Sequence, residues 1–597
     1  MNPDSCANLP RMLFDQAARL GDRPFLWAKR DGRYRPLSWR QAAAEVSRLS
    51  RGLRALGIGP GDRVALIAEN RPEWLISDVA VMAAGAITVP AYTTNAPDDH
   101  LHVLTNSGAM AAIVSGPRLA APFLDAARRA PRLEFMVAME PLGLRQDIGV
   151  EIHPWAEVLA RGGDAPDDAA DMVARLKRTD SACVIHTSGT GGTPKGVMLS
   201  HGAILSNCKG ALEAFADGIV EDEEVFLSFL PLSHSYEHTA GQFFPITIGA
   251  QIYYAEGAEH LAANMVEVRP TIMTAVPRLY ETLYQRITLG VERAAGVKEK
   301  LFLKTLELGK RKYQKPESLG WRERAVDAVL DRLVRRRLRA RFGGRLKFFV
   351  SGGAPLSYDI GLFFTALGVN ILQGYGQTET APVVSCNPPG RVKLHTVGPP
   401  FTGVEVRIAG DGEILVRGEL VMQGYWGDDA ATAEAIRDGW LHTGDIGLID
   451  EDGYLQITDR KKDIIVNSGG DNVAPQRIEG KLTLEPEISQ AMVYGDRRPY
   501  LVALIVPDEE VMGRWAEAHG RPAGLAALAG DPGFHRAIAP AVERVNRGLS
   551  AIERVRRFML AREAFGMENG LLTPTLKIRR HKIKEIYGQA LDALYGD

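Results

Sequence analysis

The stretch TSGTGGTPKG, residues 187–196, contains four glycines, three threonines, a serine, a proline and a lysine. It follows the apolar run ACVIH, so we expect it to leave the end of a buried strand, where open α/β sheets bind their ligands. Glycines let the backbone turn its amides toward a ligand, and the hydroxyls and Lys195 add donors. The stretch therefore predicts a loop for an anionic, phosphate-bearing ligand, rather than a flexible surface linker.

Two well-known phosphate loops do not fit this stretch. A Walker loop has glycine before its lysine and serine or threonine after it, whereas Pro194 and Gly196 flank Lys195 here. The dinucleotide fingerprint GxGxxG, started at Gly189, would need a glycine at position 194. The sequence therefore predicts a third kind of phosphate loop.

Short apolar segments alternate with helical stretches through the first two thirds of the chain. This pattern is typical of largely parallel sheets that helices cover on both faces, so we expect two parallel-type α/β subdomains. The expected strands lie in segments 61–70, 87–92, 110–115, 133–139, 181–189, 252–257, 270–277, 346–353 and 370–376.

From about residue 391 the pattern changes to short strands separated by Gly/Asp turns, as in VEVRIAGDGEILVRG (404–418). This change predicts a small β-barrel-like subdomain over 391–458, which completes a large N-terminal domain, 1–458. The charged DRKKD, 459–463, is expected to be a hinge, and a smaller, mobile α+β C-terminal domain is expected over 464–597.

The composition is that of an ordinary globular chain: 597 residues, 45% apolar and 24% charged, with a net charge of −2. This balance gives no global attraction to nucleic acid or to anionic lipid, so such a partner would need a local patch. Four widely spaced cysteines indicate neither a disulfide framework nor a zinc site. The N-terminus lacks a secretory signal, and the apolar stretch 79–92 is too short to span a bilayer. We therefore expect a cytoplasmic protein.

Six ordered motifs carry a resemblance to a known family. TSGTGGTPKG resembles the phosphate loop of the acyl-adenylate-forming, or AMP-binding, superfamily, which includes acyl-CoA synthetases and firefly luciferase. One position departs from the usual TSGTTG, because Gly191 replaces the second threonine and removes a hydroxyl donor. The other motifs follow in the family's order: LPLSH (230–234), SGGAPL (351–356), GYGQTET (374–380), WLHTGD (440–445) and LTPTLKIRR (572–580).

The resemblance implies a two-step reaction that needs ATP, Mg²⁺ and CoA. A carboxylate attacks the α-phosphate of ATP to give an acyl-adenylate and pyrophosphate, and a thiol then displaces AMP. Such catalysis depends on positioning and charge neutralisation rather than on a protein nucleophile. By resemblance, Glu379 would ligate Mg²⁺ and Thr378 would contact the α-phosphate. The loop residues that would contact ATP are Thr187, Ser188, Gly189, Thr190 and Lys195.

The resemblance also implies an adenosine site. Small residues after LKFFV would let adenine lie against the backbone, and the tyrosine of GYGQTET could stack on it. The acid of HTGD would accept hydrogen bonds from the ribose hydroxyls, and an arginine of the hinge would add donors. These residues are Gly352, Gly353, Ala354, Tyr375, Asp445 and Arg460.

The C-terminal domain is implied to serve both steps. Lys577 would be the catalytic lysine of adenylation, reaching the carboxylate and the α-phosphate as a compact charge. After adenylation the domain would swing about Lys462 and remove Lys577 from the site. The swing would bring Ser468, Gly469 and Gly470 toward the pantetheine channel for CoA.

A charged helical segment between PRLYETLY (277–284) and LKFFVSGG (346–353) resembles the insertion of long-chain fatty acyl-CoA synthetases. Medium- and long-chain fatty acids are therefore the expected substrates. His234 and Tyr236, with Phe243 and Phe244, would line or gate the acyl tunnel, although aromatic residues here also fit a plain core.

Three other functions stay open from the sequence. A fatty acyl-AMP ligase would pass its acyl group to a carrier protein instead of CoA. A short-chain or aryl acid CoA ligase would share the same motifs. A degenerate protein that only senses acyl groups should lack the key acids and the lysine, yet Glu379, Asp445 and Lys577 are present.

The segment from Arg322 to Arg345 has nine arginines against three acids. On a helix this surplus could contact anionic lipid, where an apolar substrate would be found, or could simply form a solvated face. We therefore expect peripheral contact with the inner face of a membrane through residues 322–345. We expect no nucleic-acid partner, and a monomer or a homodimer.

Overall fold

The computed structural model describes residues 3–143, 149–187, 193–294, 296–469, 471–573 and 577–596. Two eight-stranded sheets form the larger part of the chain. In the first sheet the central strands pair in parallel, whereas β8, β9 and β18 pair antiparallel at one edge. Its order is β18 (Gly424–Tyr425), β9 (Lys195–Ser200), β8 (Ser181–Thr187), β4 (Ile87–Pro90), β3 (Arg63–Ile67), β5 (Ala111–Val114), β6 (Phe135–Ala138), β7 (Glu151–Pro154).

The second sheet is also parallel at its centre, and one antiparallel strand closes each edge. Its strands come from both the start and the middle of the chain. The order is β15 (Val383–Cys386), β14 (Ile371–Gly376), β13 (Phe348–Ser351), β12 (Ile272–Ala275), β10 (Val225–Ser228), β11 (Gln251–Tyr254), β1 (Pro24–Arg30), β2 (Arg33–Ser38).

One hydrophobic core joins the two sheets. It contains Val64 of the first sheet and Phe226 of the second, together with Trp74 of α3 (Pro72–Ala83). Almost every residue of α3 is buried, which explains why its sequence is mostly apolar and has no polar, solvent-facing side. The other helices of this part are α1 (Leu9–Leu20), α2 (Trp39–Ala55), α4 (Pro97–Ser107), α5 (Pro117–Ala127), α6 (Trp155–Asp164), α7 (Ala169–Arg175), α8 (His201–Ala214), η2 (Glu237–Phe243), α9 (Phe244–Thr247), α10 (Leu261–Val268) and α15 (Tyr358–Ala366).

A five-stranded antiparallel sheet follows the two large sheets in sequence. Val416 and Leu455 form its small core together with Val384 of the second sheet, so it packs against that sheet's edge. The strands are β16 (Glu405–Ile408), β17 (Glu413–Arg417), β19 (Ile436–Arg437), β20 (Trp440–Ile449) and β21 (Leu455–Arg460), and α16 (Asp429–Ala435) precedes β19.

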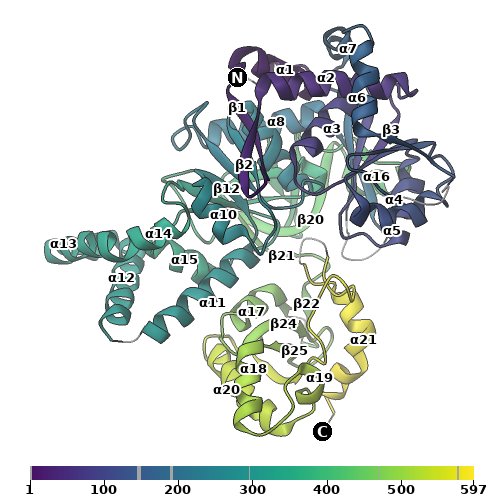
Figure 1. The fold of residues 1–597 in the computed structure, drawn as a ribbon. Helices are drawn as coiled ribbons and strands as arrows, with labels where there is room; N and C mark the ends of the chain where they lie inside the picture. The colour runs from purple at the N-terminus through teal and green to yellow at the C-terminus, as the bar shows by residue number, and fades with distance from the viewer. Residues whose placement is uncertain are drawn as a thin grey trace.

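A helical arm is inserted between β12 and β13. Figure 1 shows it projecting sideways from the body, with α13 near its outer end. The arm consists of α11 (Pro277–Ala294), α12 (Val297–Gln314), α13 (Trp321–Leu330), η4 (Asp331–Arg335) and α14 (Arg336–Arg341).

The segment after residue 462 has its own sheets and its own hydrophobic core. It lies below the body in Figure 1, and α11 contacts it through an ion pair between Arg293 and Glu510, 2.5 Å. Its elements are β22 (Ile465–Val466), β23 (Asn472–Val473), α17 (Pro475–Leu482), β24 (Ile488–Tyr494), β25 (Leu501–Pro507), α18 (Glu509–Ala518), α19 (Leu525–Leu528), α20 (Pro532–Arg547), β26 (Val555–Leu560) and α21 (Arg580–Ala593).

The architecture confirms the predicted fold class. Two parallel α/β sheets, a small antiparallel sheet and a separate α+β C-terminal unit are all present. The segments expected to be strands from the sequence contain β3, β4, β5, β6, β8, β11, β12, β13 and β14.

Candidate active site

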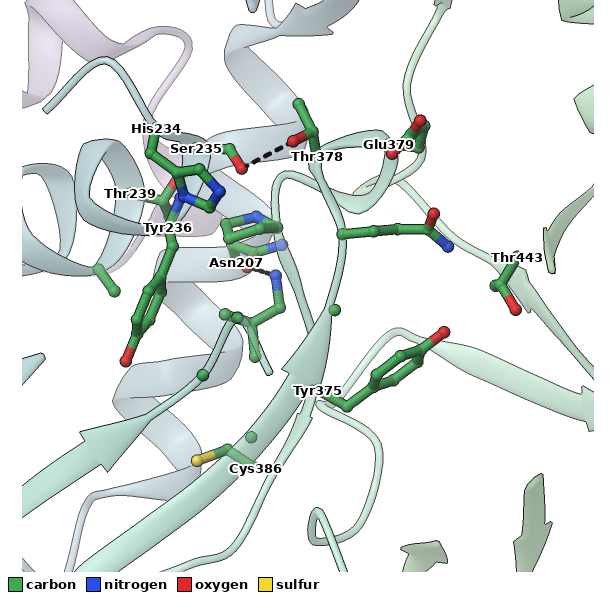
Figure 2. A pocket seen from close by; sticks show the side chains of 18 of the residues that line it. Asn207, His234, Ser235, Tyr236, Thr239, Tyr375, Thr378, Glu379, Cys386 and Thr443 are labelled. Carbon is green, nitrogen blue, oxygen red and sulfur yellow. Dashed lines mark hydrogen bonds between the residues drawn. The ribbon is translucent and has the colours of Figure 1, made fainter. Parts of the chain in front are cut away.

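A cavity of about 510 Å³ opens where the second sheet, the antiparallel sheet and the C-terminal unit meet. Gly352 follows the carboxyl end of β13 and Gly376 ends β14, so the cavity lies where ligands of parallel sheets usually bind. One end is lined by charged and hydroxyl side chains, the other by apolar rings. Figure 2 shows His234, Ser235 and Thr378 on one side of the cavity and Tyr375 and Thr443 on another.

The charged end lies beside the predicted phosphate loop. Thr187 ends β8 and lines the cavity, and Lys195 begins β9. The Lys195 ammonium lies 4.8 Å from the ring centroid of Tyr425, and the Tyr425 hydroxyl donates to Glu379 Oε1 at 2.9 Å. Glu379 is therefore close to the end of the loop. Ser188, Gly189, Thr190 and Gly191 lie outside the described residues.

The segment that carries Thr378 and Glu379 is the short helix η5 (Thr378–Thr380). Asn207 of α8 fixes it, because its side chain donates to Thr380 O at 3.0 Å and accepts from the Val383 amide at 2.7 Å. The Thr378 hydroxyl lies 3.1 Å from the Ser235 hydroxyl (Figure 2). Both predicted residues line the cavity.

The predicted adenosine residues converge on the same cavity. The Tyr375 hydroxyl donates to Asp445 Oδ2 at 2.6 Å, and Arg460 Nε lies 3.2 Å from Asp445 Oδ1. Asp445 and Arg460 are register partners on β20 and β21, so sheet pairing brings the acid and the arginine together. Gly352 and Gly353 line the cavity, whereas Ala354 is exposed and is not among the residues that line it.

The turn after β13 has glycine at positions 352 and 353 for steric reasons. A side chain at Gly352 would reach within 3.2 Å of the Tyr236 ring, and Gly353 has a φ of +82°, which favours glycine. A larger residue would therefore press on Tyr236 at position 352 and strain the turn at position 353. The turn after β13 therefore stays open for a flat ligand.

Lys577 enters the cavity from the C-terminal unit. Thr573 and Lys577 hold each other, because the Thr573 amide donates to Lys577 O at 2.8 Å and the Lys577 amide donates to Thr573 Oγ1 at 3.0 Å. Burial, with a smaller contribution from the Arg460 guanidinium, lowers the pKa of Lys577 to about 8. Lys462, the predicted hinge residue, lines the same cavity.

The apolar end begins at His234 and Tyr236. Burial, assisted by the charge of Lys577, lowers the pKa of His234 to about 3, so its imidazole is neutral at physiological pH. Its Nδ1 accepts from the Tyr236 amide at 3.1 Å, and the Tyr236 hydroxyl donates to Val350 O at 2.8 Å. Both predicted side chains line the cavity (Figure 2).

Phenylalanine rings line the far part of the cavity. Phe244 lies 6.0 Å from Phe215 and 6.2 Å from Phe226, measured between ring centroids, and Phe401 lies 6.5 Å from Phe215. The prediction that Phe243 also lines the tunnel is wrong. Phe243 is fully buried and packs against His238, 5.0 Å away, because consecutive residues of a helix face different sides.

The residues predicted to approach CoA do not line this cavity. The Ser468 amide donates to Arg498 O at 3.0 Å, and the Gly469 amide donates to Asn467 Oδ1 at 2.9 Å, so both belong to an exposed loop of the C-terminal unit. Gly470 lies outside the described residues. In this structure the C-terminal unit presents Lys577, not this loop, to the cavity.

The donor set is compatible with a magnesium ion that arrives with a nucleotide. Among the described residues, no group of three or more His, Cys, Asp or Glu side chains is arranged to hold a metal ion. Mg²⁺ is usually bound through one or two carboxylates together with substrate phosphates. Glu379, close to the end of the predicted phosphate loop, is a carboxylate that could serve in this way.

Several residues of the site were not singled out from the sequence. Tyr425 links Lys195 to Glu379, and Asn207 supports η5 from 173 residues before Thr380. Each makes its contact across two separate elements, so no local spacing reveals it. Tyr425 lies in the aromatic motif QGYWGD, but the motif by itself indicates no role for the tyrosine. The pairing of β18 with β9 places Tyr425 near Lys195 and Glu379.

Two family models match the chain over most of its length. The model described as AMP-binding enzyme matches residues 13–426, and the AMP-binding enzyme C-terminal domain matches residues 462–597. The first includes Lys195, Tyr375 and Glu379, and the second includes Lys577.

Relatives and solved structures agree with these matches. Long-chain-fatty-acid–CoA ligase FadD15 of Mycobacterium bovis is 35% identical over 586 residues, covering 95% of this chain and 93% of that protein. Long chain acyl-CoA synthetase 7, peroxisomal, of Arabidopsis thaliana is 33% identical, covering 95% and 82%. The adenylation domain of a carboxylic acid reductase from Segniliparus rugosus, solved with AMP and a carboxylic acid, superposes with a TM-score of 0.78 at 22% identity, covering 99% and 94%. The chain thus belongs to the AMP-binding enzyme family, whose members form acyl-adenylates.

Proposed function

We propose that this enzyme activates medium- to long-chain fatty acids with ATP and transfers the acyl group to CoA. The observation that carries the proposal is a single cavity with two unlike ends. Asp445, Glu379 and Lys577 line the charged end, whereas Phe226 and Phe244 line the apolar end. Relatives named as a long-chain fatty acid CoA ligase and as a long chain acyl-CoA synthetase support the substrate class.

In the first step a carboxylate oxygen of the acid attacks the α-phosphorus of ATP, and the bond to pyrophosphate breaks. Lys577 would neutralise charge on the carboxylate and on the α-phosphate, with Thr378 beside them. Asp445 and Tyr375 would hold the ribose and the adenine, so the reacting atoms are positioned rather than activated by a protein nucleophile. His234 is neutral and would not repel or bind the acid by charge.

Glu379 would hold Mg²⁺ together with the phosphates of ATP, and the ion would neutralise charge on the departing pyrophosphate. The Tyr425 hydroxyl orients Glu379 through its 2.9 Å hydrogen bond, and the same ring carries the Lys195 ammonium. Tyr425 therefore couples the metal-binding acid to the phosphate-binding lysine.

In the second step the CoA thiolate attacks the acyl carbonyl carbon, and AMP leaves with the carboxylate oxygen. We propose that the C-terminal domain, 464–597, swings about Lys462 within the hinge 459–463 between the steps. This motion would take Lys577 out and bring the loop of Ser468 and Gly469 in. The present arrangement, with Lys577 in the cavity, suits the first step.

The test is fatty-acid-dependent pyrophosphate release, measured with a series of saturated acids and with free CoA. We expect acyl-CoA and AMP to form with medium- and long-chain acids. An enzyme that releases pyrophosphate but forms no acyl-CoA would instead be an acyl-AMP ligase for a carrier protein. Activity confined to acetate or benzoate would overturn the proposed substrate class.

The Phe244 ring is expected to limit the length of the acid. Phe244→Ala would lengthen the apolar end and favour an acid two carbons longer by about 10-fold in relative kcat/KM, since each buried methylene contributes about 0.8 kcal/mol. Phe243→Ala is the matched control, because it removes an adjacent ring that does not line the cavity. An unchanged chain-length profile in Phe244→Ala, or an equal shift in Phe243→Ala, would contradict the assignment.

We also propose that the ligase is cytoplasmic and acts at the inner face of a membrane. Long-chain acids partition into lipid, so a peripheral enzyme would meet its substrate there. None of the helices in the described ranges is both long and apolar enough to cross a membrane.

A further inference from the structure

The outer face of the arm exposes a row of apolar side chains. Helices α13, η4 and α14 follow one another without a break from residue 321 to residue 341. Val326, Val329 and Leu333 are 45%, 57% and 44% exposed, and their spacing of three and four residues places them on one helical face. Trp321, 76% exposed, begins the same helix. Apolar side chains gathered on an exposed face mark an interaction site.

Cations surround this row. Besides Arg324, which donates to Leu319 O at 3.1 Å, five arginines of the same helix are exposed, and among the described residues none of these five forms an ion pair. Arg322 lies over the Trp321 ring at 5.1 Å. Positions 322, 326, 329, 333 and 336 alternate in steps of four and three, so arginines stand at both ends of the apolar row. The five are Arg322, Arg332, Arg336, Arg337 and Arg341.

The acids of this helix lie on its other side. Asp327 pairs with Arg335 at 2.7 Å, and Asp331 pairs with Arg339 at 2.9 Å. Glu323 pairs with Arg311 of α12 at 2.6 Å. Since each acid is neutralised next to the arm's interior, the outer face keeps only positive charge.

Arg335 differs from its neighbours in the RRR run. It is buried, and its guanidinium donates to Ala366 O at 2.8 Å besides pairing with Asp327. Leu330 packs with Leu308 and Leu319 on the same inner side. The membrane contact expected of residues 322–345 therefore does not include Arg335, which anchors the helix to the body.

We infer that this outer face, defined by Trp321, Val326, Val329 and Leu333 with their five arginines, docks on an anionic lipid bilayer. The inference rests on the proposed location at a membrane and names the surface that makes the contact. Guanidinium groups would meet lipid phosphates while the apolar row enters the boundary of the acyl chains. The arm projects from the body, so this face can reach a flat surface (Figure 1).

Two triple variants separate the charged from the apolar contribution. The first variant replaces Arg332, Arg336 and Arg337 with serine. It should bind vesicles of phosphatidylcholine and phosphatidylglycerol more weakly, on the order of 100-fold, because each arginine contributes about five-fold to the affinity. The second variant replaces Trp321, Val329 and Leu333 with serine and should also bind the vesicles more weakly. The binding that remains is electrostatic, so it should vanish at an ionic strength of about 1 M, where the Debye length is about 3 Å. Binding is measured by vesicle flotation of the full-length enzyme.

The control replaces Arg33, Arg35 and Arg536 with serine, which removes the same charge from exposed positions elsewhere. This control should float like the wild type. Equal loss in the control, or no loss in either arm variant, would overturn the docking surface. Wild-type binding to an acidic protein but not to the anionic vesicles would overturn it in favour of a protein partner.

Activity distinguishes this inference from the proposed function. Both arm variants should keep the wild-type kcat/KM for octanoate in solution, because the arm face does not line the cavity. A wild-type enzyme that activates no fatty acid refutes the ligase proposal, while flotation still tests the surface by itself.

Discussion

Replacing Lys577 with alanine is expected to lower the rate of acyl-adenylate formation about 100- to 1,000-fold, the range seen when one preorganised charge-stabilising group is removed. Lys577 is the cavity-lining lysine that the C-terminal domain supplies next to Asp445 and Glu379. Its ammonium would lie where negative charge from the carboxylate and the α-phosphate meets. Pyrophosphate release with a saturating fatty acid measures this step directly.

The pH dependence of kcat/KM tests the role of Lys577 independently. The pKa of Lys577 is lowered to about 8, so the free enzyme holds the charged form below this pH and loses it above. The kcat/KM for ATP should therefore be flat up to about pH 8 and fall as the pH rises further. Lys577→Arg keeps its proton over this range, so any activity it retains should not show the decline.

The second half-reaction is the control for Lys577→Ala. Thioester formation from supplied acyl-AMP and CoA should stay within about threefold of the wild-type rate, since the proposed swing removes Lys577 before CoA reacts. Equal losses in both half-reactions would show that the substitution damages the domain or its docking, and would contradict a role confined to adenylation.

The fold could be predicted because its elements have strong local signals. The apolar runs that became β3, β5 and β13 are four or five residues long and are bounded by turns or helices. The apolar segment at 79–92, which is too short to span a bilayer, contains the end of α3 followed by β4. Such segments are determined by burial, which the sequence pattern records.

Residues of the site could be predicted only where they belong to a sequence motif of the family. Asp445, Tyr375, Glu379 and Lys577 all line the cavity, and each was named from a family motif, because no local spacing relates Lys577 to the other three across a domain boundary. The side-chain direction at Phe243 depends on the π-helical turn η2 that precedes α9. Arg335 looks like any other arginine in a basic run until its ion pair with Asp327 is seen. These features depend on tertiary contacts.

Replacing Glu379 with glutamine is expected to lower adenylation about 100-fold or more, because the proposed magnesium site would lose its carboxylate charge. Glutamine keeps the shape and can still accept the hydrogen bond of Tyr425, so the change isolates the charge. The affinity for ATP with Mg²⁺, measured by calorimetry, should fall. The affinity for AMP should not, since the proposed adenosine contacts lie around Asp445 and Tyr375.

Tyr425→Phe is the graded companion of Glu379→Gln. It removes only the hydroxyl that donates to Glu379 at 2.9 Å and keeps the ring under Lys195, so we expect about a 10-fold loss, the size of one hydrogen bond to a charged group. Because the hydroxyl acts through the carboxylate, it should lose most of its effect in the Glu379→Gln background, and the double variant should be little worse than Glu379→Gln alone. If the rate losses of the two single variants multiply in the double variant, Tyr425 acts on ATP by a route that does not involve Glu379. If the Glu379→Gln variant forms acyl-adenylate at a rate within threefold of the wild-type rate, Glu379 is not part of the proposed metal site.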